Sequence, residues 1–261
     1  MAVVKAITSR DNALLVRLRK LAHDPVGYRK AGQVWLEGEH LCQAFVQRGG
    51  TVAQAVVSED CWEQPGLRAL ADMAETVAVV PAALMAGLST LESPPPIAFA
   101  VPWAGETSLR PGAASVVLDR LQDAGNVGTV LRSAAAFGFE QVVALKGTAA
   151  LWSPKVLRAG MGAHFGLHLV EGVEPAALGA LAMPLLATSS HATQAIHDVR
   201  LPWPCAWVLG HEGQGIAAAL LAACAQSLRI PQPGGEESLN VAAAAAVCLY
   251  ESARQRAAAQ A

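Results

Sequence analysis

The sequence predicts an α/β protein made of two domains. Short apolar strands alternate with helix-forming segments along the chain, whose 261 residues suit one large or two modest domains. Apolar residues make up 53% of the chain and charged residues only 15%, which argues against a disordered protein. A segment with proline and glycine, 102–108, reads as a linker, so we expect domains at residues 1–106 and 107–261.

The first domain opens with an amphipathic helix. Ser9, Asp11 and Asn12 can cap it, and leucines at helical spacing continue the pattern to about residue 23. Strands are then expected at 34–36, 52–57, 77–80 and 97–101, and helices at 41–47, at 66–74 and from Pro81. This alternation indicates a small α/β domain.

Positive charge is concentrated in the first 50 residues. They hold eight Lys or Arg against four acidic residues, although the whole chain has a net charge of −2. A basic front predicts a polyanionic partner, but a solvated helix face explains the charge equally well. The candidate contact residues are the cations around the apolar stripe of the first helix: Arg10, Arg17, Arg19 and Lys20.

The cysteines and the hydropathy pattern indicate a cytoplasmic protein. Five widely spaced cysteines without a C-x-x-C pair favour buried thiols over disulfides, and they predict no metal site. No apolar signal core opens the chain, and no apolar run reaches the ~18 residues of a membrane span.

The second domain is predicted to contain a parallel sheet covered on both faces. Apolar strands are expected at 115–118, 141–145, 167–170, 184–188 and 206–209, with the end of a further strand at 227–230. Helices are expected from about Asn126 to Phe137, from Ser153–Pro154, and over 175–181.

A loop of unusual composition, I-P-Q-P-G-G-E-E-S-L-N-V at 230–241, follows the last strand. Its two prolines and two glycines exclude regular structure, so its main-chain groups are able to hold a small polar ligand. Ser238, Asn240 or Glu237 can cap the helix that follows. Small side chains at 242–246 indicate close passage of another backbone segment, although a plain helix cap after a surface loop fits the local pattern too.

Two further polar motifs follow strands of this domain. N-V-G-T-V-L-R at 126–132 places Arg132 on an otherwise apolar helix, so it must reach a cleft or an acidic partner; a salt-bridged structural arginine is the ordinary explanation. G-H-E-G-Q-G at 210–215 differs from the G-x-G-x-x-G dinucleotide fingerprint, which disfavours a nicotinamide oxidoreductase. Its glycines allow close backbone approach to a ligand, and Glu212 is either a helix cap or a site carboxylate.

In this order and spacing, the three motifs resemble those of the SpoU (TrmH-type) RNA 2′-O-ribose methyltransferases of the SPOUT superfamily. The resemblance spans the second domain, whereas the first domain resembles the ribosomal-protein-like α/β RNA-binding domain often fused ahead of it. The cues there are the basic opening helix and L-E-G at 36–38. Ala124 and Gln232 stand where the family commonly has proline and methionine, and we expect them to tune substrate or cofactor contacts.

The resemblance implies a deep trefoil knot in the C-terminal parallel-sheet domain, S-adenosylmethionine bound by the knot loops, and a homodimer through this knotted domain. It gives main-chain contacts with the cofactor to Gly210, Ile230 and Leu239, and places Thr188 at the cofactor pocket. The polar positions around the transferred methyl group are Asn126, Arg132, Glu212, Ser238 and Asn240. Binding of RNA is implied for the basic first domain.

The implied reaction is methyl transfer to a ribose 2′-hydroxyl of RNA, and the two-domain layout favours 23S ribosomal RNA over transfer RNA. Because a guanidinium keeps its proton, we favour Arg132 as a clamp on a phosphate and the developing alkoxide, while direct proton acceptance by Arg132 stays open. The alternatives are a tRNA 2′-O-methyltransferase, a SPOUT base methyltransferase and a non-catalytic RNA-binding adapter. The pairing of Asn126 with Arg132 favours ribose over a base, and an adapter does not need Arg132, Glu212 and Asn240 together.

Overall fold

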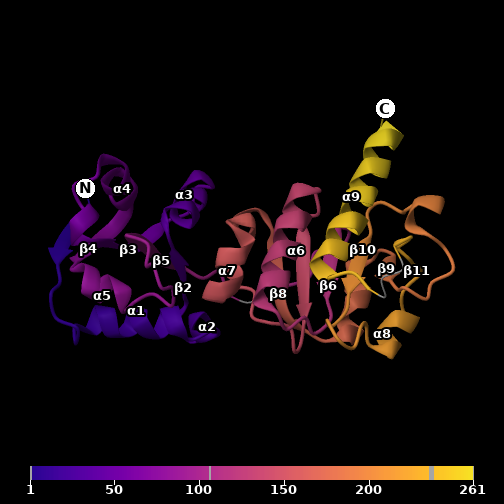
Figure 1. The fold of residues 1–261 in the computed structure, drawn as a ribbon, viewed down its shortest axis with the longest axis horizontal. Coiled ribbons are helices and arrows are strands. Elements are labelled where there is room, and N and C mark those ends of the chain that lie inside the picture. Colours follow the sequence, from indigo (N-terminus) through magenta and orange to yellow (C-terminus); the bar gives the residue numbers. More distant parts are fainter. Residues whose placement is uncertain (1, 106, 235–237, 261) are drawn as a thin grey trace. The chain divides into compact units, whose positions relative to one another are not determined.

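The structure is a computed structural model that describes residues 2–105, 107–234 and 238–260. The chain forms two compact units (Figure 1). Unit 1 comprises Met1–Gly105 and Trp152–Phe165, and unit 2 comprises Glu106–Leu151 and Gly166–Ala261. The linker expected at 102–108 therefore contains the change of unit, but a short segment of the later sequence packs with unit 1. The assignment of RNA binding to unit 1 and of catalysis to unit 2 stays a prediction.

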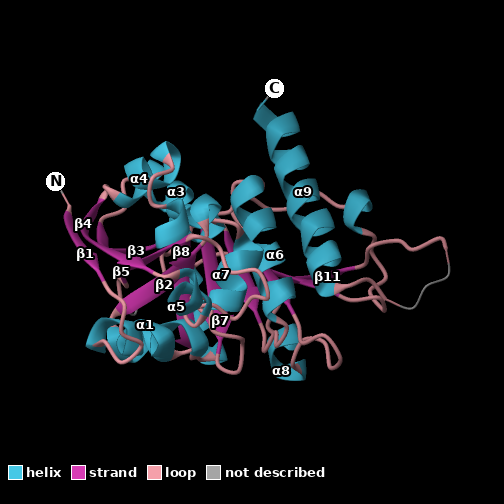
Figure 2. Cartoon of the chain, turned by 60° about the vertical axis from the view of Figure 1, so that its left-hand side comes forward, coloured by secondary structure: helices cyan, strands magenta, loops and turns pink. Residues whose placement is uncertain are grey.

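Unit 1 contains a five-stranded mixed sheet. Its elements are β1 (Val3–Ala6), α1 (Ala13–His23), α2 (Gly27–Ala31), β2 (Gln33–Glu37), α3 (Glu39–Gln47), β3 (Val52–Ser58), η1 (Glu59–Cys61), α4 (Pro65–Ala71), β4 (Ala74–Val80), α5 (Ala82–Ala86), β5 (Ile97–Pro102) and α7 (Pro154–Gly160). The strand order is β1-β4-β3-β5-β2, with β5 antiparallel to both of its neighbours. Figures 1 and 2 show α3 and α4 on one side of the sheet, and α1, α2 and α5 on the other.

The first helix follows the predicted pattern. The side-chain oxygen of Asn12 accepts a hydrogen bond from the backbone N–H of Leu14 at 3.0 Å, and α1 ends at His23. Leu15, Leu18 and Leu21 are buried, so the leucine stripe forms the inner face of the helix as expected.

The remaining boundaries in unit 1 differ from the predictions where strand pairing decides them. The helix predicted at 66–74 ends at Ala71, because β4 begins at Ala74 and pairs with β3 from Val52 to Ser58. Backbone hydrogen bonds across the sheet thus extend the strand beyond its apolar run at 77–80. Strand β1 and helix α2 were not predicted.

Helix α7 packs with unit 1 although it lies far along the sequence. The Arg158 guanidinium donates to the carboxylate of Glu37 at 3.1 Å, and the Glu37 side chain is only 4% exposed. Phe165 meets Phe45 edge to face, with ring centroids 5.1 Å apart. These contacts join residues separated by more than a hundred positions, so the local sequence pattern gave no sign of them.

Unit 2 is built on a six-stranded parallel sheet, as the sequence predicted. Its elements are β6 (Ser115–Leu118), α6 (Ala124–Ala136), β7 (Gln141–Leu145), β8 (His168–Val173), η3 (Pro175–Leu181), β9 (Leu185–Thr188), η4 (Ile196–Asp198), β10 (Ala206–Leu209), α8 (Ala218–Ala222), β11 (Gln226–Leu228) and α9 (Val241–Gln260); the short helix η2 (Ala163–Gly166) spans the change of unit before β8. The order β11-β9-β10-β6-β7-β8 has parallel pairing throughout.

Alternate residues of each central strand face opposite sides of this sheet. Val117, Val143 and Val208 join a buried cluster with residues of η3 and α8. On the other side α6 and α9 lie side by side (Figures 1 and 2), and the Trp207 indole N–H donates to the Ser252 hydroxyl of α9 at 2.9 Å. Both faces of the sheet are therefore covered.

Helices α6 and η3 differ from the predictions in extent and type, and helix α8 was not predicted. Helix α6 begins at Ala124, two residues before Asn126, because the carboxylate of Asp123 accepts from the Asn126 N–H at 2.7 Å and caps the helix. The helix expected over 175–181 is a 3₁₀ helix, and tight three-residue hydrogen bonds mark it from Ala177 N–H to Glu174 and from Ala182 N–H to Gly179.

Candidate active site

A cavity of about 750 Å³ lies in unit 2 at the carboxyl ends of β9, β10 and β11. Loops that follow neighbouring parallel strands meet at this edge of a sheet, which is where α/β proteins hold their ligands. The lining residues are 188–191 after β9, 210–216 after β10, 230, 232 and 238–241 after β11, together with Leu221 and Ala244.

The four residues predicted to contact a cofactor, Thr188, Gly210, Ile230 and Leu239, all line this one cavity. The structure also places the predicted polar residues Glu212, Ser238 and Asn240 on its wall. The second and third motifs therefore share one site. Which ligand atoms these residues contact stays a prediction.

Gly210 is required by the shape of the loop that it opens. A Cβ atom at this position would lie 2.2 Å from the backbone nitrogen of Ile216 and 2.3 Å from the carbonyl carbon of Gly215. Paired backbone bonds between His211 and Gly215, at 2.8 and 3.1 Å, close the loop. The imidazole Nδ1 of His211 accepts from the N–H groups of Gly213 and Gln214, at 3.0 and 3.3 Å. This wall of the cavity is a compact glycine loop of defined shape.

Glu212, Asn126 and Asn240 form one hydrogen-bonded chain. The Glu212 carboxylate accepts from the backbone N–H groups of Gln122 and Asp123, at 3.2 and 3.0 Å, and from the Asn126 side-chain amide at 3.3 Å. The Asn126 carbonyl oxygen accepts from the Asn240 amide at 3.0 Å. One residue from each predicted motif is thereby joined, across 86 and 114 positions of sequence.

Each end of that chain also fixes the backbone of a helix. Asn240 accepts from the N–H groups of Ala242 and Ala243, at 2.9 and 3.3 Å, and so caps α9.

Burial alone would raise the pKa of Glu212, but its hydrogen bonds from backbone N–H groups and Asn126 hold the pKa below the ordinary value. Glu212 is therefore an ionised acceptor at neutral pH. Glu237, another candidate cap, lies outside the described residues.

Arg132 does not line the cavity, and its side chain is exposed on α6. No ion pair of Arg132 occurs among the described residues. Its predicted role at the site and the alternative of a structural salt bridge both stay predictions. Ser238 is also exposed, and its hydroxyl makes no hydrogen bond within the described part of the chain.

Sequence analysis missed one pair of residues, Asp119 and Arg120. The Asp119 carboxylate is buried and accepts from Arg120 Nε and Nη2, at 2.9 and 3.1 Å, and from the backbone N–H of Ala217 at 2.7 Å. Arg120 also donates to the Gln214 side chain at 3.0 Å and to the Gly215 carbonyl at 3.4 Å. The available signal was an acidic residue directly after the apolar strand 115–118.

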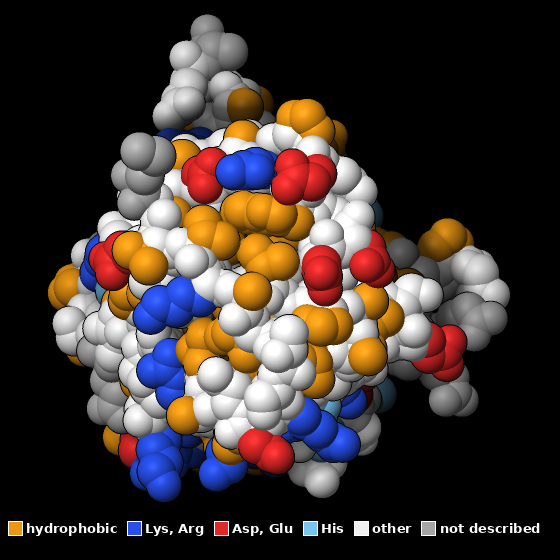
Figure 3. Space-filling model, turned by 90° about the vertical axis from the view of Figure 1, so that its left-hand side faces the viewer, with side chains coloured by type: hydrophobic (Ala, Val, Ile, Leu, Met, Phe, Trp, Pro, Cys, Tyr) orange, Lys and Arg blue, Asp and Glu red, His pale blue; other side chains and the backbone are white. Residues whose placement is uncertain are grey.

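The four candidate cations of unit 1 have two different environments. Arg10, Arg17 and Lys20 are exposed, whereas Arg19 is partly buried and its Nε has no partner among the described residues. Figure 3 shows the side of unit 1 with Lys and Arg side chains mostly in its lower half, the side on which Figure 1 draws α1. The exposed cations can meet a polyanion, but Arg19 is less accessible.

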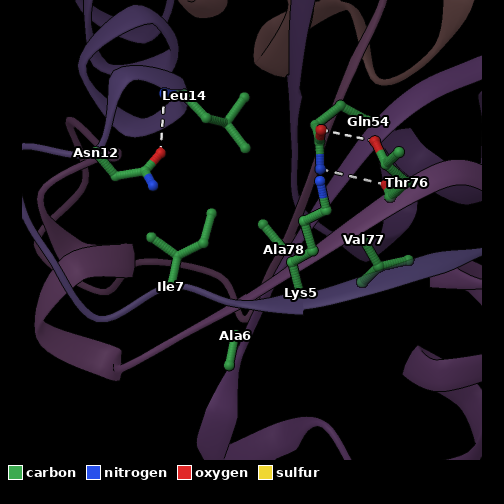
Figure 4. Close-up of a pocket in the computed structure, with 9 residues that line it drawn as sticks. All are labelled: Lys5, Ala6, Ile7, Asn12, Leu14, Gln54, Thr76, Val77 and Ala78. Carbon is green, nitrogen blue, oxygen red and sulfur yellow. Dashed lines mark hydrogen bonds between the residues drawn. The ribbon is translucent and has the colours of Figure 1, made fainter.

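Unit 1 also has a cavity of about 560 Å³ beside β1, β4 and the start of α1 (Figure 4). Apart from Lys5, which is exposed, its polar side chains are bonded to one another or to backbone. The Thr76 hydroxyl donates to Gln54 Oε1 at 2.7 Å, and Gln54 Nε2 donates to the carbonyl of Ala55 at 2.9 Å. Asn12 is engaged as the cap of α1. This cavity therefore gives no comparable sign of a ligand.

Neither a metal site nor a membrane span is found in the described part of the chain. No group of three His, Cys, Asp or Glu side chains in residues 2–105, 107–234 and 238–260 is arranged to hold a metal ion. No helix within those ranges is both long enough and apolar enough to cross a membrane.

A glycine loop, an ionised network and a cavity at the carboxyl ends of a parallel sheet define an α/β enzyme that binds a polar small molecule. The family model of the SpoU rRNA methylases matches residues 113–250, and the chain belongs to this family. It is 33% identical to a tRNA/rRNA methyltransferase of Synechocystis sp., over 97% of this chain and 95% of that protein.

Two further similarities extend over both units. The chain is 30% identical to the 23S rRNA (guanosine(2553)-2′-O)-methyltransferase RlmP of Bacillus subtilis, over 95% of this chain and 98% of that protein. A crystal structure of an RNA 2′-O ribose methyltransferase has a TM-score of 0.81 at 30% identity, covering 97% of this chain and all of that one. The SpoU resemblance and the parallel-sheet fold predicted from the sequence are confirmed.

Proposed function

We propose that the protein transfers the methyl group of S-adenosylmethionine to a ribose 2′-hydroxyl of ribosomal RNA, with 23S rRNA as the favoured substrate. The observation that carries this proposal is the joining of all three motifs by the Glu212–Asn126–Asn240 chain beside one ligand cavity. Family membership and the names of the full-length relatives support the same reaction. Action on rRNA would place the protein in the cytoplasm.

S-adenosylmethionine supplies an activated methyl group on its sulfonium. Transfer to the 2′-oxygen would leave the cofactor as its neutral thioether, and the 2′-hydroxyl proton would pass to solvent water. The residues of this chain must align the two reactants, which can contribute up to ~7–11 kcal/mol in an ideal geometry. The fixed glycine loop and the backbone around Thr188, Ile230 and Leu239 would hold the cofactor.

The polar network would act on the ribose side. Ser238 lies on the cavity wall, and its hydroxyl makes no hydrogen bond with the described residues. Glu212 holds Asn126, and Asn126 in turn accepts from Asn240. Because Arg132 is exposed and has no acidic partner in the described chain, its guanidinium is available for an RNA phosphate and the developing alkoxide. Acceptance of the hydroxyl proton by Arg132 remains the second possibility.

We further propose a homodimer formed through unit 2, with the trefoil knot typical of this family's fold. Val247 and Tyr250 of α9 are 40% and 55% exposed, which supports a contact surface on this helix. Light scattering should give twice the chain mass of 27.0 kDa. A variant with Val247→Glu and Tyr250→Glu should be monomeric, and a monomeric wild type would contradict the proposal.

Unit 1 is proposed to dock RNA through Arg10, Arg17 and Lys20. Deleting residues 1–105 would be a poor test, because α7 would lose its buried partner Glu37. A triple alanine variant should instead lower the slope of log affinity against log salt by about 0.7–0.9 per lost phosphate contact. Lys155→Ala, an exposed cation elsewhere in unit 1, is the matched control. An unchanged slope in the triple variant would refute this role.

The test of the reaction is methylation by the purified full chain with radiolabelled S-adenosylmethionine. Protein-free 23S rRNA, 16S rRNA and tRNA from a deletion strain are the substrates, and nuclease digestion separates 2′-O-methyl from base-methyl products. Label in a 2′-O-methylated dinucleotide of 23S rRNA is expected. Label only in tRNA would show that tRNA is the substrate, and label on a base would show that the enzyme is a base methyltransferase. Absence of both label and cofactor binding would overturn the proposal.

A further inference from the structure

We propose that Arg120 is a positioning residue for the cofactor, acting through the 210–217 loop, without touching the reacting atoms. This inference rests on the proposed function, because it concerns how the same cavity keeps its shape. Arg120 belongs to neither the cavity lining nor the predicted set of site residues. Its contacts reach the glycine loop from β6, the central strand next to β10.

The Arg120 guanidinium forms a clamp between Asp119 and the loop residues Gln214 and Gly215. The guanidinium binds the Asp119 carboxylate with two of its nitrogens, at 2.9 and 3.1 Å. It simultaneously donates to the Gln214 side chain at 3.0 Å, and to the Gly215 carbonyl at 3.4 Å. A planar fork with several donors can bridge a carboxylate and a loop in this way, whereas a single ammonium cannot.

The clamp is fixed to the rest of unit 2 through the buried carboxylate of Asp119. The Asp119 side chain is only 4% exposed, and its carboxylate also accepts from the Ala217 N–H at 2.7 Å. Asp119 and Arg120 together therefore hold three residues of the loop, Gln214, Gly215 and Ala217. Gln214 and Gly215 themselves line the cavity, as do all the other loop residues from Gly210 to Ile216. Release of the clamp should widen the range of shapes that the cavity adopts before a ligand binds.

The backbone of Arg120 has a conformation that is unusual for a residue with a side chain. Its φ of 60° lies in the left-handed region, which favours glycine over residues with a Cβ. A residue with a Cβ at this position therefore raises the conformational energy of the backbone. The four hydrogen bonds of the guanidinium give the arginine side chain a function there. The same feature makes Arg120→Gly a suitable test, because glycine fits this backbone while the variant removes the guanidinium and its bonds to Asp119, Gln214 and Gly215. The melting temperature then reports the separate cost of leaving Asp119 without its partner.

The experiment measures S-adenosylmethionine binding by calorimetry, together with the melting temperature and single-turnover rates, in the full-length protein. Arg120→Gly should stay folded and bind the cofactor about tenfold more weakly, the effect of one lost charge-assisted hydrogen bond. Arg120→Lys should not restore affinity. Guanidinium ion added at millimolar concentration should partly restore binding in Arg120→Gly and leave the wild type unchanged. The rate at saturating cofactor should fall much less than the affinity.

Ala182→Gly is the matched control, since Ala182 has a φ of 53° and lies outside the cavity lining. It should leave cofactor affinity unchanged. Equal cofactor affinity in wild type and Arg120→Gly, or an equal loss of cofactor affinity in Ala182→Gly, would overturn this inference but not the proposed function. Failure of the wild type to bind S-adenosylmethionine would overturn the proposed function, and this inference with it.

Discussion

Replacement of Arg132 by alanine separates the catalytic role of this residue from a structural one. The side chain is exposed on α6 and has no ion pair in the described chain, so its removal takes away no buried contact. We expect the free energy of unfolding to change by less than about 0.5 kcal/mol, the usual range for such surface positions. In a protein of this size that corresponds to a melting-temperature shift of about 1–2 °C.

The catalytic consequence should be much larger. If Arg132 binds the phosphate and the developing alkoxide, its loss should lower the single-turnover rate by ~10²–10³, equivalent to about 2.7–4 kcal/mol of transition-state stabilisation. Cofactor affinity should be unchanged, because Arg132 does not line the cavity. Arg132→Lys should recover little activity, since an ammonium cannot bind phosphate and ribose as a planar fork does.

The assay compares melting temperature, cofactor affinity and single-turnover methylation in wild type, Arg132→Ala and Arg132→Lys. Lys155→Ala removes an exposed helical cation on α7 and serves as the control for charge and helix propensity. A folded Arg132→Ala protein that methylates RNA at the wild-type rate would refute the reasoning. A loss of several kcal/mol in stability would instead show that the side chain has a buried partner.

Three further predictions concern two residues of the cavity wall and the buried carboxylate of Asp119. Gly210→Ala should abolish cofactor binding, measured by calorimetry, because its Cβ would lie 2.2 Å from a backbone nitrogen; a variant that binds normally would show that the loop can relax. Gln232→Met should raise stability by about 1 kcal/mol, measured by denaturant unfolding, because the buried Oε1 of Gln232 has no hydrogen-bond partner in the described chain; a loss of stability would contradict this. The pKa of Asp119 is held below its usual value of 3.8, because hydrogen bonds from Arg120 and the Ala217 N–H outweigh the effect of burial. Its contribution to stability is thus complete above that pH and disappears as pH falls through the lower folded-state value, so the stability difference between wild type and Asp119→Asn should shrink in acid; a constant difference from pH 6 to about 3 would be inconsistent with this shift.

Much of the fold could be predicted because the signals are local. The leucine stripe of α1, the apolar strands of unit 2 and the proline–glycine loop before α9 each appear within a few consecutive residues. The cavity could also be located, since Thr188, Gly210 and Ile230 lie at or just beyond the ends of strand-forming segments, and parallel strands bring such positions together.

The errors arose where distant contacts override local preference. Helix propensity placed 66–74 in one helix, but pairing with β3 made Ala74 the start of a strand. Helix α7 was expected in the second domain because of its sequence position, whereas the ion pair between Arg158 and the buried Glu37 attaches it to unit 1. The residues next to Ala74 do not show that it pairs with β3, and those next to Arg158 do not show that it binds Glu37.

The sequence by itself determined most of the strands and the three motifs, because spacing and residue type are properties of the chain. The class of reaction followed from the resemblance of those motifs to a known family. Only the tertiary structure decided how these parts act together. The Glu212–Asn126–Asn240 chain and the Arg120 clamp depend on side chains that come within hydrogen-bonding distance across 86 to 114 positions of sequence. That distance is set by the packing of the sheet and its loops. The exposure of Arg132 was decided in the same way, because the packing of α6 against α9 determines which side chains of that helix reach solvent.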